Sequence, residues 1–316
     1  MKLKKNYSAS KKILIVSSSR EEAITQWAIQ RQQSKGAPLS LMHNGRQIDW
    51  LILSDLLQGL QIHDELNQDS VSIRWYSKNS IKYSNDSHVL LNRITYIDNK
   101  LFESYCIADR EYAKREFEAY LGFALNSFDK VQAIAINGLC ERILSLPQQW
   151  NLVKKKLGLA VPDFFWGFKQ KKAINVTFSI EKKIHSSIYD YLNWTVQQNT
   201  ADNLETINPF VTPIKSSEFY FEKPEGEPIF ILSIGEKILI SPDDKISFQQ
   251  QEKIKKCVTK VRKLFNYFIF ELLVFLTKDA LVFGCVNIDL LHTKNHPDFF
   301  LFLDKYLINE YYRCLP

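Results

Sequence analysis

Hydrophobic and polar residues alternate along this chain in patterns that change from one region to the next. Residues 1–100 contain a short apolar run, KILIVSSS, typical of a buried strand, and then EEAITQWAIQRQ. In that second stretch Ala23, Ile24, Trp27 and Ala28 fall on one helical face. The stretches APLSLMHNGRQIDWLILSD and VSIRWYSKNSIKYS alternate around turn signals and predict short strands and hairpins. The first hundred residues therefore predict an N-terminal α/β domain.

A central α/β segment is predicted over residues 101–165, after the strand VLLNRITYID. ADREYAKREFEAYLGFALNSF predicts a long helix with Asp109 as its N-cap. AIAIN predicts a short buried strand ending at Asn137, and QQWNLVKKKLGLAVPDFFWG predicts a helix that stops at Gly158. Alternation of strand and helix predicts an α/β sheet.

The remaining chain divides into a small β-rich lobe, residues 166–245, and a C-terminal lobe, residues 246–316. The β-rich lobe is predicted from AINVTFSI, SSEFYFEK, EPIFILSI and EKILIS, around a polar stretch, VQQNTADNLETINPF, interpreted as a mobile loop. The C-terminal lobe begins with a basic amphipathic helix from about Phe248 to Phe268. It ends with two apolar segments, LVFGCVNIDL and FLFLDKY, predicted to be paired strands.

Composition indicates a globular protein, since 45% of the 316 residues are hydrophobic and 24% are charged. The apolar run near the N-terminus is too short for a secretory signal, and LFNYFIFELLVFL, broken by Asn266 and Glu271, is too short to span a membrane. Five scattered cysteines with no CxxC pair indicate neither a disulfide framework nor a zinc ribbon. We expect a cytoplasmic protein with no membrane partner, and the oligomeric state stays open, a homo-oligomer included.

The net charge of +6 comes from local lysine clusters, which could meet nucleic acid or an acidic peptide. In the stripe from Lys253 to Lys263, core residues alternate with lysines, so the stripe is interpreted as the solvated face of an ordinary helix. A nucleic-acid partner is therefore not favoured. The chain has no GxxxxGK[ST], GxSxG or HExxH motif, which removes support for the enzyme classes that use them.

Asp289 and Asp304 close the two predicted strands and have two interpretations. They could hold a magnesium ion across a hairpin, or they could be strand-end acids that face water. His292, His296 and Asp298 could likewise form a metal cluster with Asp289, although a polar turn explains them as well.

Arg93 and the aromatic residues around Trp166 each have more than one interpretation. Arg93 could contact a phosphate or a partner acid, or could form a surface salt bridge. Trp166, with the aromatic residues Phe164, Phe165 and Phe168, could form a stack between lobes or a peptide groove, and core packing is the favoured interpretation.

Taken together, VLLNRITYID, the YAKREFEAYLGFAL helix, AIAIN, LGLAVPDFFWG, the pair EPIFILSIGEKILIS, and LVFGCVNIDL followed by FLFLDKY resemble the ATP-grasp superfamily. The order and spacing are similar to its peptide-modifying branch, which contains the graspetide (microviridin-type) ligases. The resemblance implies an α/β (α+β) fold with an N-terminal pre-ATP-grasp domain, a small β-rich lobe and a C-terminal lobe. It also implies ATP and Mg²⁺, a carboxylate that is phosphorylated and then attacked by an amine or hydroxyl, and a peptide or protein substrate, with a possible partner maturation enzyme.

The family's closing strands carry an acid after an Ile and then Phe-Leu-Glu-x-Asn. The resemblance assigns the first acid to Asp289 and the second to Asp304, with Tyr306 in place of the Asn. The family strand Asp-Ile-Arg-Val corresponds to Pro228–Ile231, so Phe230 takes the place of the phosphate-binding Arg.

The lysines that could supply positive charge to the phosphates also match the family positions poorly. Lys172 and Lys182 can be offered for the family's phosphate lysine only in poor register, and Lys215 lies at the hinge where an acid is expected. Losing one charge-assisted phosphate contact from a dry site costs about 2 to 4 kcal/mol. We therefore interpret the chain as a ligase-like protein of peptide maturation with an eroded nucleotide site and no assigned catalytic residue. The alternatives are a non-catalytic peptide-binding partner or scaffold of the same fold and, second, a basic nucleic-acid-binding protein.

Overall fold

A computed structural model of the chain describes residues 11–33, 48–78, 80–140, 144–167, 184–185, 218–222, 224–241, 246–277 and 280–315. These residues form two compact units. Unit 1 comprises Met1–Arg142 together with Pro297–Pro316, and unit 2 comprises Ile143–His296. The C-terminal segment thus belongs with the N-terminal part of the chain.

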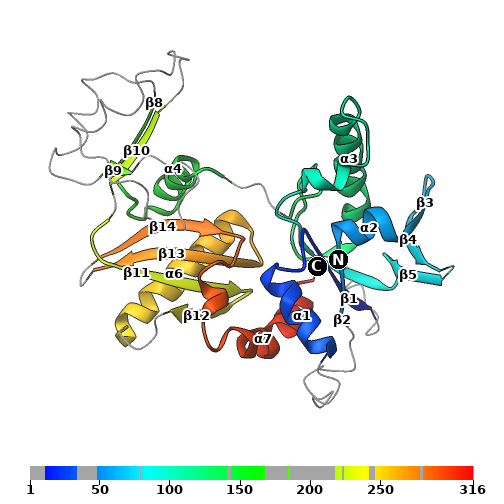
Figure 1. The fold of residues 1–316 in the computed structure, drawn as a ribbon. Helices are drawn as coiled ribbons and strands as arrows, with labels where there is room; N and C mark the ends of the chain where they lie inside the picture. Colours follow the sequence, from blue (N-terminus) through cyan, green and yellow to red (C-terminus); the bar gives the residue numbers. More distant parts are fainter. Residues whose placement is uncertain are drawn as a thin grey trace. The chain divides into compact units, whose positions relative to one another are not determined.

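A parallel sheet with the strand order β2-β1-β6-β7 is the centre of unit 1. Strands β1 and β2 of this sheet are labelled in Figure 1. Its strands are β1 (Lys12–Ser17), β2 (Ile48–Ile52), β6 (His88–Arg93) and β7 (Asp129–Lys130). The predicted helix is α1 (Ala23–Gln33), which follows β1. Every residue of β6 is buried, as expected for a parallel strand covered on both faces. The α/β nature of this region is confirmed.

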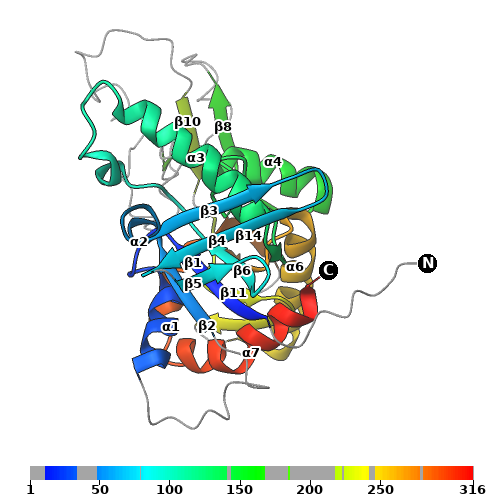
Figure 2. The ribbon, with the colours of Figure 1, turned by 90° about the vertical axis from the view of Figure 1, so that its right-hand side faces the viewer.

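An antiparallel sheet forms the second layer of strands in unit 1. Its members are β3 (Gln61–Leu66), β4 (Val71–Ser77) and β5 (Ser80–Ser84), and the long β3–β4 hairpin is seen in Figure 2. The predicted alternation of β4 is confirmed, because Ile73 and Trp75 are buried while their neighbours are partly exposed. Trp75 Nε1 donates to the hydroxyl of Tyr120, 2.7 Å away on α3, and so joins this sheet to a helix.

The other helices of unit 1 are α2 (Leu53–Gly59), η3 (Asn99–Phe102), α3 (Arg110–Asn126) and α7 (Phe299–Cys314). Asp109 stands at the N-cap of α3 as predicted, although its side chain makes no capping hydrogen bond there. None of the helices in the described ranges is long and apolar enough to cross a membrane.

The prediction of a buried strand at AIAIN is wrong, because residues 133–137 lie in a turn. Ala135 N–H donates to the carbonyl of Leu139 at 3.0 Å, and Gly138 adopts a φ of 82°. Ile136 is 93% exposed. Its carbonyl lies where a Cβ on Gly122 of α3 would be, so a close approach to a helix glycine, rather than a sheet, holds this segment.

Unit 2 contains two antiparallel sheets, ordered β12-β11-β13-β14 and β8-β10-β9. The strands are β8 (Phe164–Gly167), β9 (Ile184–His185), β10 (Glu218–Glu222), β11 (Glu227–Ile234), β12 (Lys237–Ser241), β13 (Ile269–Leu276) and β14 (Leu281–Asn287). The predicted β11–β12 hairpin is confirmed, with Gly235 in its turn at a φ of 54°. AINVTFSI and VQQNTADNLETINPF lie outside the described residues.

The helices in the described part of unit 2 are α4 (Leu146–Leu157), α6 (Phe248–Phe265) and the short η5 (Thr293–Asn295). Gly158 ends α4 in a left-handed conformation, as predicted. Asn266 ends α6 in the same way, slightly before the predicted limit. Trp150 Nε1 donates to the carbonyl of Gly284 at 2.5 Å and fastens α4 to β14.

The prediction that FLFLDKY forms a closing strand is wrong, because these residues belong to α7. The buried residues of α7 recur at helical spacing, and they are Phe299, Phe302, Leu303, Leu307, Ile308, Glu310 and Tyr311. A short apolar window does not separate strand from helix by itself. β14 instead pairs with β13, so the apolar run that precedes LVFGCVNIDL supplies its partner strand.

Candidate functional site

One face of the β12-β11-β13-β14 sheet gathers side chains of different chemistry. Leu232, Glu271 and Asn287 lie opposite one another on β11, β13 and β14. Residues opposite each other in antiparallel strands share a face, and so do residues two positions apart. Phe230 and Cys285 therefore lie on the same face as Glu271 and Asn287.

Glu271 is a buried charged group of this face and is 2% exposed. Its Oε2 accepts the backbone N–H of His292 at 3.0 Å and that of Thr293 at 2.7 Å. Its Oε1 lies 3.2 Å from His292 Nδ1, which must donate because a carboxylate only accepts. Burial of a carboxylate is costly unless it is hydrogen-bonded. The chain just after β14 therefore satisfies both oxygens of Glu271.

His292 also covers the neighbouring part of the face. Its ring stacks on Phe230, with ring centroids 3.8 Å apart and an interplanar angle of 11°. The same imidazole thus binds the carboxylate on β13 and covers the aromatic ring on β11. We call the four residues Phe230, Glu271, His292 and Thr293 the plug.

Cys285 and Asn287 complete the face. Burial, with a smaller contribution from the charge of Glu271, raises the pKa of the Cys285 thiol well above its ordinary value, so it stays protonated and a poor metal ligand. Asn287 Oδ1 accepts the N–H of Asp289 at 3.1 Å. Asn287 Nδ2 and Thr293 Oγ1 are buried, and neither has a partner among the described residues. Asn287 Nδ2 can donate a hydrogen bond to a small polar molecule such as water, and Thr293 Oγ1 can donate or accept one.

These residues do not fit a magnesium-bound nucleotide. Mg²⁺ requires several oxygen ligands in octahedral geometry. On this face Glu271 is the carboxylate, and its oxygens already accept three hydrogen bonds from the chain. Within the described residues, no group of three or more His, Cys, Asp or Glu side chains could hold a metal ion. Phe230 offers no charge to a phosphate.

The predicted metal residues Asp289 and Asp304 belong to different compact units. Asp304 lies on α7, where it forms an ion pair with Arg31 and accepts a 2.5 Å hydrogen bond from Trp27 Nε1. The prediction of a closing hairpin, on which the pairing of Asp289 with Asp304 rested, is wrong. Magnesium binding at either aspartate stays a prediction, as does phosphate binding by Lys172, Lys182 and Lys215, which lie outside the described residues.

The observed strand pairing also changes the register of the motif comparison. β14 contains Phe283-Gly284-Cys285-Val286-Asn287, which matches Phe-Leu-Glu-x-Asn at its first and last positions and has Cys285 in place of the Glu. Sequence reasoning missed Glu271, Asn287 and the role of His292. A signal was present, because Glu271 is a lone acid within an apolar run.

The structure also shows the contacts of His292, Arg93 and Phe164, the other residues for which the sequence left alternatives open. His292 belongs to the plug rather than to a described metal cluster with His296 and Asp298. Arg93 is 1% exposed and pairs with Glu22 at 3.0 Å, so its salt bridge is buried rather than on the surface. Phe164 packs against Trp150 with centroids 5.3 Å apart, in agreement with core packing.

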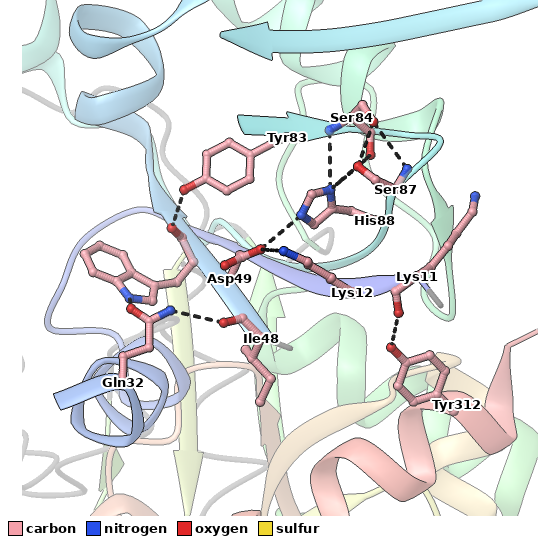
Figure 3. A network of polar contacts seen from close by, with 11 residues as sticks. Lys11, Lys12, Gln32, Ile48, Asp49, Tyr83, Ser84, Ser87, His88 and Tyr312 are labelled. Carbon is pink, nitrogen blue, oxygen red and sulfur yellow. Dashed lines mark hydrogen bonds and ion pairs between the residues drawn. The ribbon is translucent and has the colours of Figure 1, made fainter. Parts of the chain in front are cut away.

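A second polar network lies in unit 1, around His88 (Figure 3). His88 Nε2 lies 3.1 Å from Asp49, and its Nδ1 lies 2.8 Å from the hydroxyl of Ser87. Ser87, His88 and Asp49 thus follow one another as a nucleophile, a base and an acid do in a catalytic triad. However, the N–H of Ser87 is bonded to the carbonyl of Ser84, so it is not available for an oxyanion, and Asp49 also pairs with Lys12. We interpret the network as a tie between β1, β2, β5 and β6.

Comparison with known proteins gives fold similarity at low sequence identity. No family model and no curated protein matches the sequence. The macrocyclase MdnC of Microcystis aeruginosa MRC, solved with its precursor peptide MdnA, is 14% identical, with a TM-score of 0.64 over 94% of this chain and 99% of that one. A RiPP-associated ATP-grasp ligase of Chryseobacterium gregarium, solved with ADP and a leader and core peptide, is 12% identical, with a TM-score of 0.64 over 97% and 98%.

A more distant similarity links the chain to a ligase of a different substrate class. The VanG D-Ala:D-Ser ligase of Enterococcus faecalis is 11% identical, with a TM-score of 0.52 over 96% of this chain and 99% of that one. The matches span nearly the whole of each protein. The chain therefore has the ATP-grasp ligase fold, in a divergent form similar to that of the peptide-modifying ligases.

Proposed function

We propose that this protein binds a precursor peptide in a peptide-maturation pathway and does not carry out the ATP-dependent ligation of its fold. One observation carries the second half of the proposal. The acid on β13 is buried beneath the chain's own His292 and Thr293, and His292 is stacked on the ring that replaces the expected Arg. A nucleotide-bound Mg²⁺ would have to compete with the three hydrogen bonds that the Glu271 oxygens already accept. The phosphate itself would find no positive charge at Phe230.

The peptide part of the proposal is supported by the similar structures. The MdnC and Chryseobacterium ligases were both solved with peptides bound. The chain keeps this fold over its whole length, whereas Phe230 is uncharged and the oxygens of Glu271 already accept hydrogen bonds. These observations support a scaffold that binds a peptide without a nucleotide. An active carboxylate-amine or carboxylate-hydroxyl ligase is the second candidate, supported by the ADP in the Chryseobacterium complex. It would use cations from Lys172, Lys182 or Lys215.

Nucleotide binding separates the two candidates. A ligand that binds the native state must stabilise it. Because we propose that the protein does not bind the nucleotide, we expect millimolar ATP or AMPPNP with Mg²⁺ to leave the thermal midpoint unchanged and to give no heat in calorimetric titration. The Chryseobacterium ligase, whose structure contains ADP, serves as the positive control when treated identically. Magnesium-dependent stabilisation by ATP, or release of ADP in the presence of a peptide, would overturn the proposal and support the ligase.

Peptide binding is tested separately, by selection from a library of random peptides. We expect binders to be enriched and their affinity to be the same with and without Mg·ATP. Failure to enrich any sequence, while MdnC enriches MdnA that has been added to the same library, would contradict the peptide-binding role.

A further inference from the structure

The solvent-facing side of α6 is strongly basic. Five of its lysines are exposed, and Arg262 is half-buried; the lysines are Lys253, Lys255, Lys256, Lys260 and Lys263. The helix contains one acidic residue, Glu252, which pairs with Lys255 at 2.8 Å. The opposite side of the helix is buried through Ile254, Cys257, Val258 and Val261. This arrangement gives the exposed side of the helix a net positive charge.

A groove lies along one edge of this basic side, between α6 and the β11–β12 turn. Its volume is about 290 Å³, and its lining residues are Gly235, Glu236, Ile238, Lys255, Val258, Thr259 and Arg262. Ile238 and Val258 supply apolar surface, while Lys255 and Arg262 place positive charge at the rim. Glu236 pairs with Arg262 at 3.5 Å. The groove therefore combines an apolar floor with a cationic border.

The helix extends the charge away from the groove. Lys256 and Lys263 lie three residues before and four residues after Thr259, so they adjoin it on the helix surface. A ligand seated in the groove would thus reach further cations on the next strip of α6.

We propose that the α6 groove binds an acidic peptide segment, with an apolar side chain in the groove and flanking carboxylates on Lys255, Lys256 and Lys263. The size of the groove suits one or two side chains and is at the lower limit for a drug-sized ligand. A nucleic-acid backbone fits less well, because it carries no apolar side chain to cover Ile238 and Val258 in the groove. The inference goes beyond the proposed function, because this surface is separate from the plug and does not depend on the state of Glu271.

The test uses a fluorescein-labelled peptide of repeating Glu-Glu-Leu units and measures fluorescence anisotropy with the full-length protein. Binding is expected to weaken as salt is added, because exposed charges are screened. The same peptide with Gln in place of every Glu is expected not to bind. A triple variant, Lys255→Glu, Lys256→Glu and Lys263→Glu, is expected to lose affinity by about tenfold or more at low salt.

The control variant is Lys154→Glu, Lys155→Glu and Lys156→Glu, which makes the same charge change on exposed lysines of α4 in the same unit. It is expected to change affinity by about twofold or less, through net charge alone. Because all six lysines are exposed, both variants should keep the wild-type circular dichroism spectrum. Equal losses in the two variants, no binding of the acidic peptide, or tighter binding of a DNA duplex through the same three α6 lysines would each overturn the proposal. None of these outcomes depends on whether ATP binds.

Discussion

At the scale of single residues, two buried charges in the described part of the chain, Glu271 and Arg93, are satisfied by nearby partners. Glu271 accepts two backbone N–H groups and an imidazole, and Arg93 pairs with Glu22 inside unit 1. Removing one member of such a set leaves the other buried and unpaired, which costs more than the interaction contributes. A substitution at one of these positions should therefore affect folding before it affects binding, and their roles must be tested with conservative variants.

Asp49 gives a prediction for pH dependence. Burial alone would raise the pKa of Asp49, but the hydrogen bond from His88 and the charge of Lys12 outweigh it and lower the pKa below its ordinary value. The stabilisation from ionised Asp49 is then present above a pH of about 4 and is lost as pH falls through the lowered pKa. We expect Asp49→Asn to reduce the free energy of unfolding by about 1 kcal/mol near neutral pH.

Urea unfolding of both proteins, at neutral pH and again at a pH of about 3, measures this difference. The gap between wild type and variant should shrink at the lower pH. Asp86→Asn, at an exposed position in the turn between β5 and β6, should show little gap at either pH. A gap for Asp49→Asn that grows as pH falls would contradict the sign of the pKa shift.

At the scale of elements, α7 joins parts of unit 1 that are far apart in the sequence. It lies beside α1 in both views (Figures 1 and 2). The hydroxyl of Tyr312 donates to the carbonyl of Lys11 at 2.7 Å, and that of Tyr311 donates to the carbonyl of Leu90. Asp304 adds the ion pair with Arg31 and the hydrogen bond from Trp27. The helix thus contacts α1 and the two central strands of the parallel sheet.

The Asp304 contacts predict that Asp304→Ala lowers the free energy of unfolding by about 1 to 3 kcal/mol, because Trp27 Nε1 and the Arg31 guanidinium lose a partly buried charged acceptor. Unfolding in buffer without magnesium measures the loss. Lys305→Ala, at the exposed neighbouring position, is the control and should be nearly neutral. A variant that keeps its stability but loses magnesium binding would instead support the earlier prediction of a metal ligand.

At the scale of the whole molecule, unit 2 is continuous in sequence and unit 1 is not. Unit 1 requires both Met1–Arg142 and Pro297–Pro316, since α7 covers Trp27 and contacts β1 and β6. A domain folds independently when its own residues complete its core. The two units should therefore behave differently when the chain is divided.

We expect a fragment Ile143–His296 to fold alone, with dispersed amide signals in an NMR spectrum and a cooperative unfolding transition. The fragment Met1–Arg142 should be poorly folded, because the buried side of α7 would be missing from its core. Adding a synthetic peptide of Pro297–Pro316 should restore structure, as seen by circular dichroism. A stable Met1–Arg142 fragment that does not bind this peptide would show that α7 is dispensable.

Particular elements show how far the sequence alone leads. β1, α1 and β4 and the β11–β12 hairpin follow from local periodicity, and α4 and α6 follow from periodicity together with their left-handed end residues. AIAIN and FLFLDKY were assigned wrongly because a short apolar window fits a strand, a turn or a helix equally well until its neighbours are known.

The sequence by itself determined the fold class, because hydrophobic periodicity and helix ends are local properties that each segment carries with it. The family resemblance also implied that Phe230 takes the place of a phosphate-binding Arg, and this correspondence stays a prediction. Only the tertiary structure decided that β13 is the partner of β14, that Asp304 binds Arg31, and that His292 covers Glu271. The last two contacts join residues 273 and 21 positions apart in the sequence. The choice of β13 as the partner of β14 depends on how the following apolar segment packs as α7, so local sequence pattern does not encode any of the three.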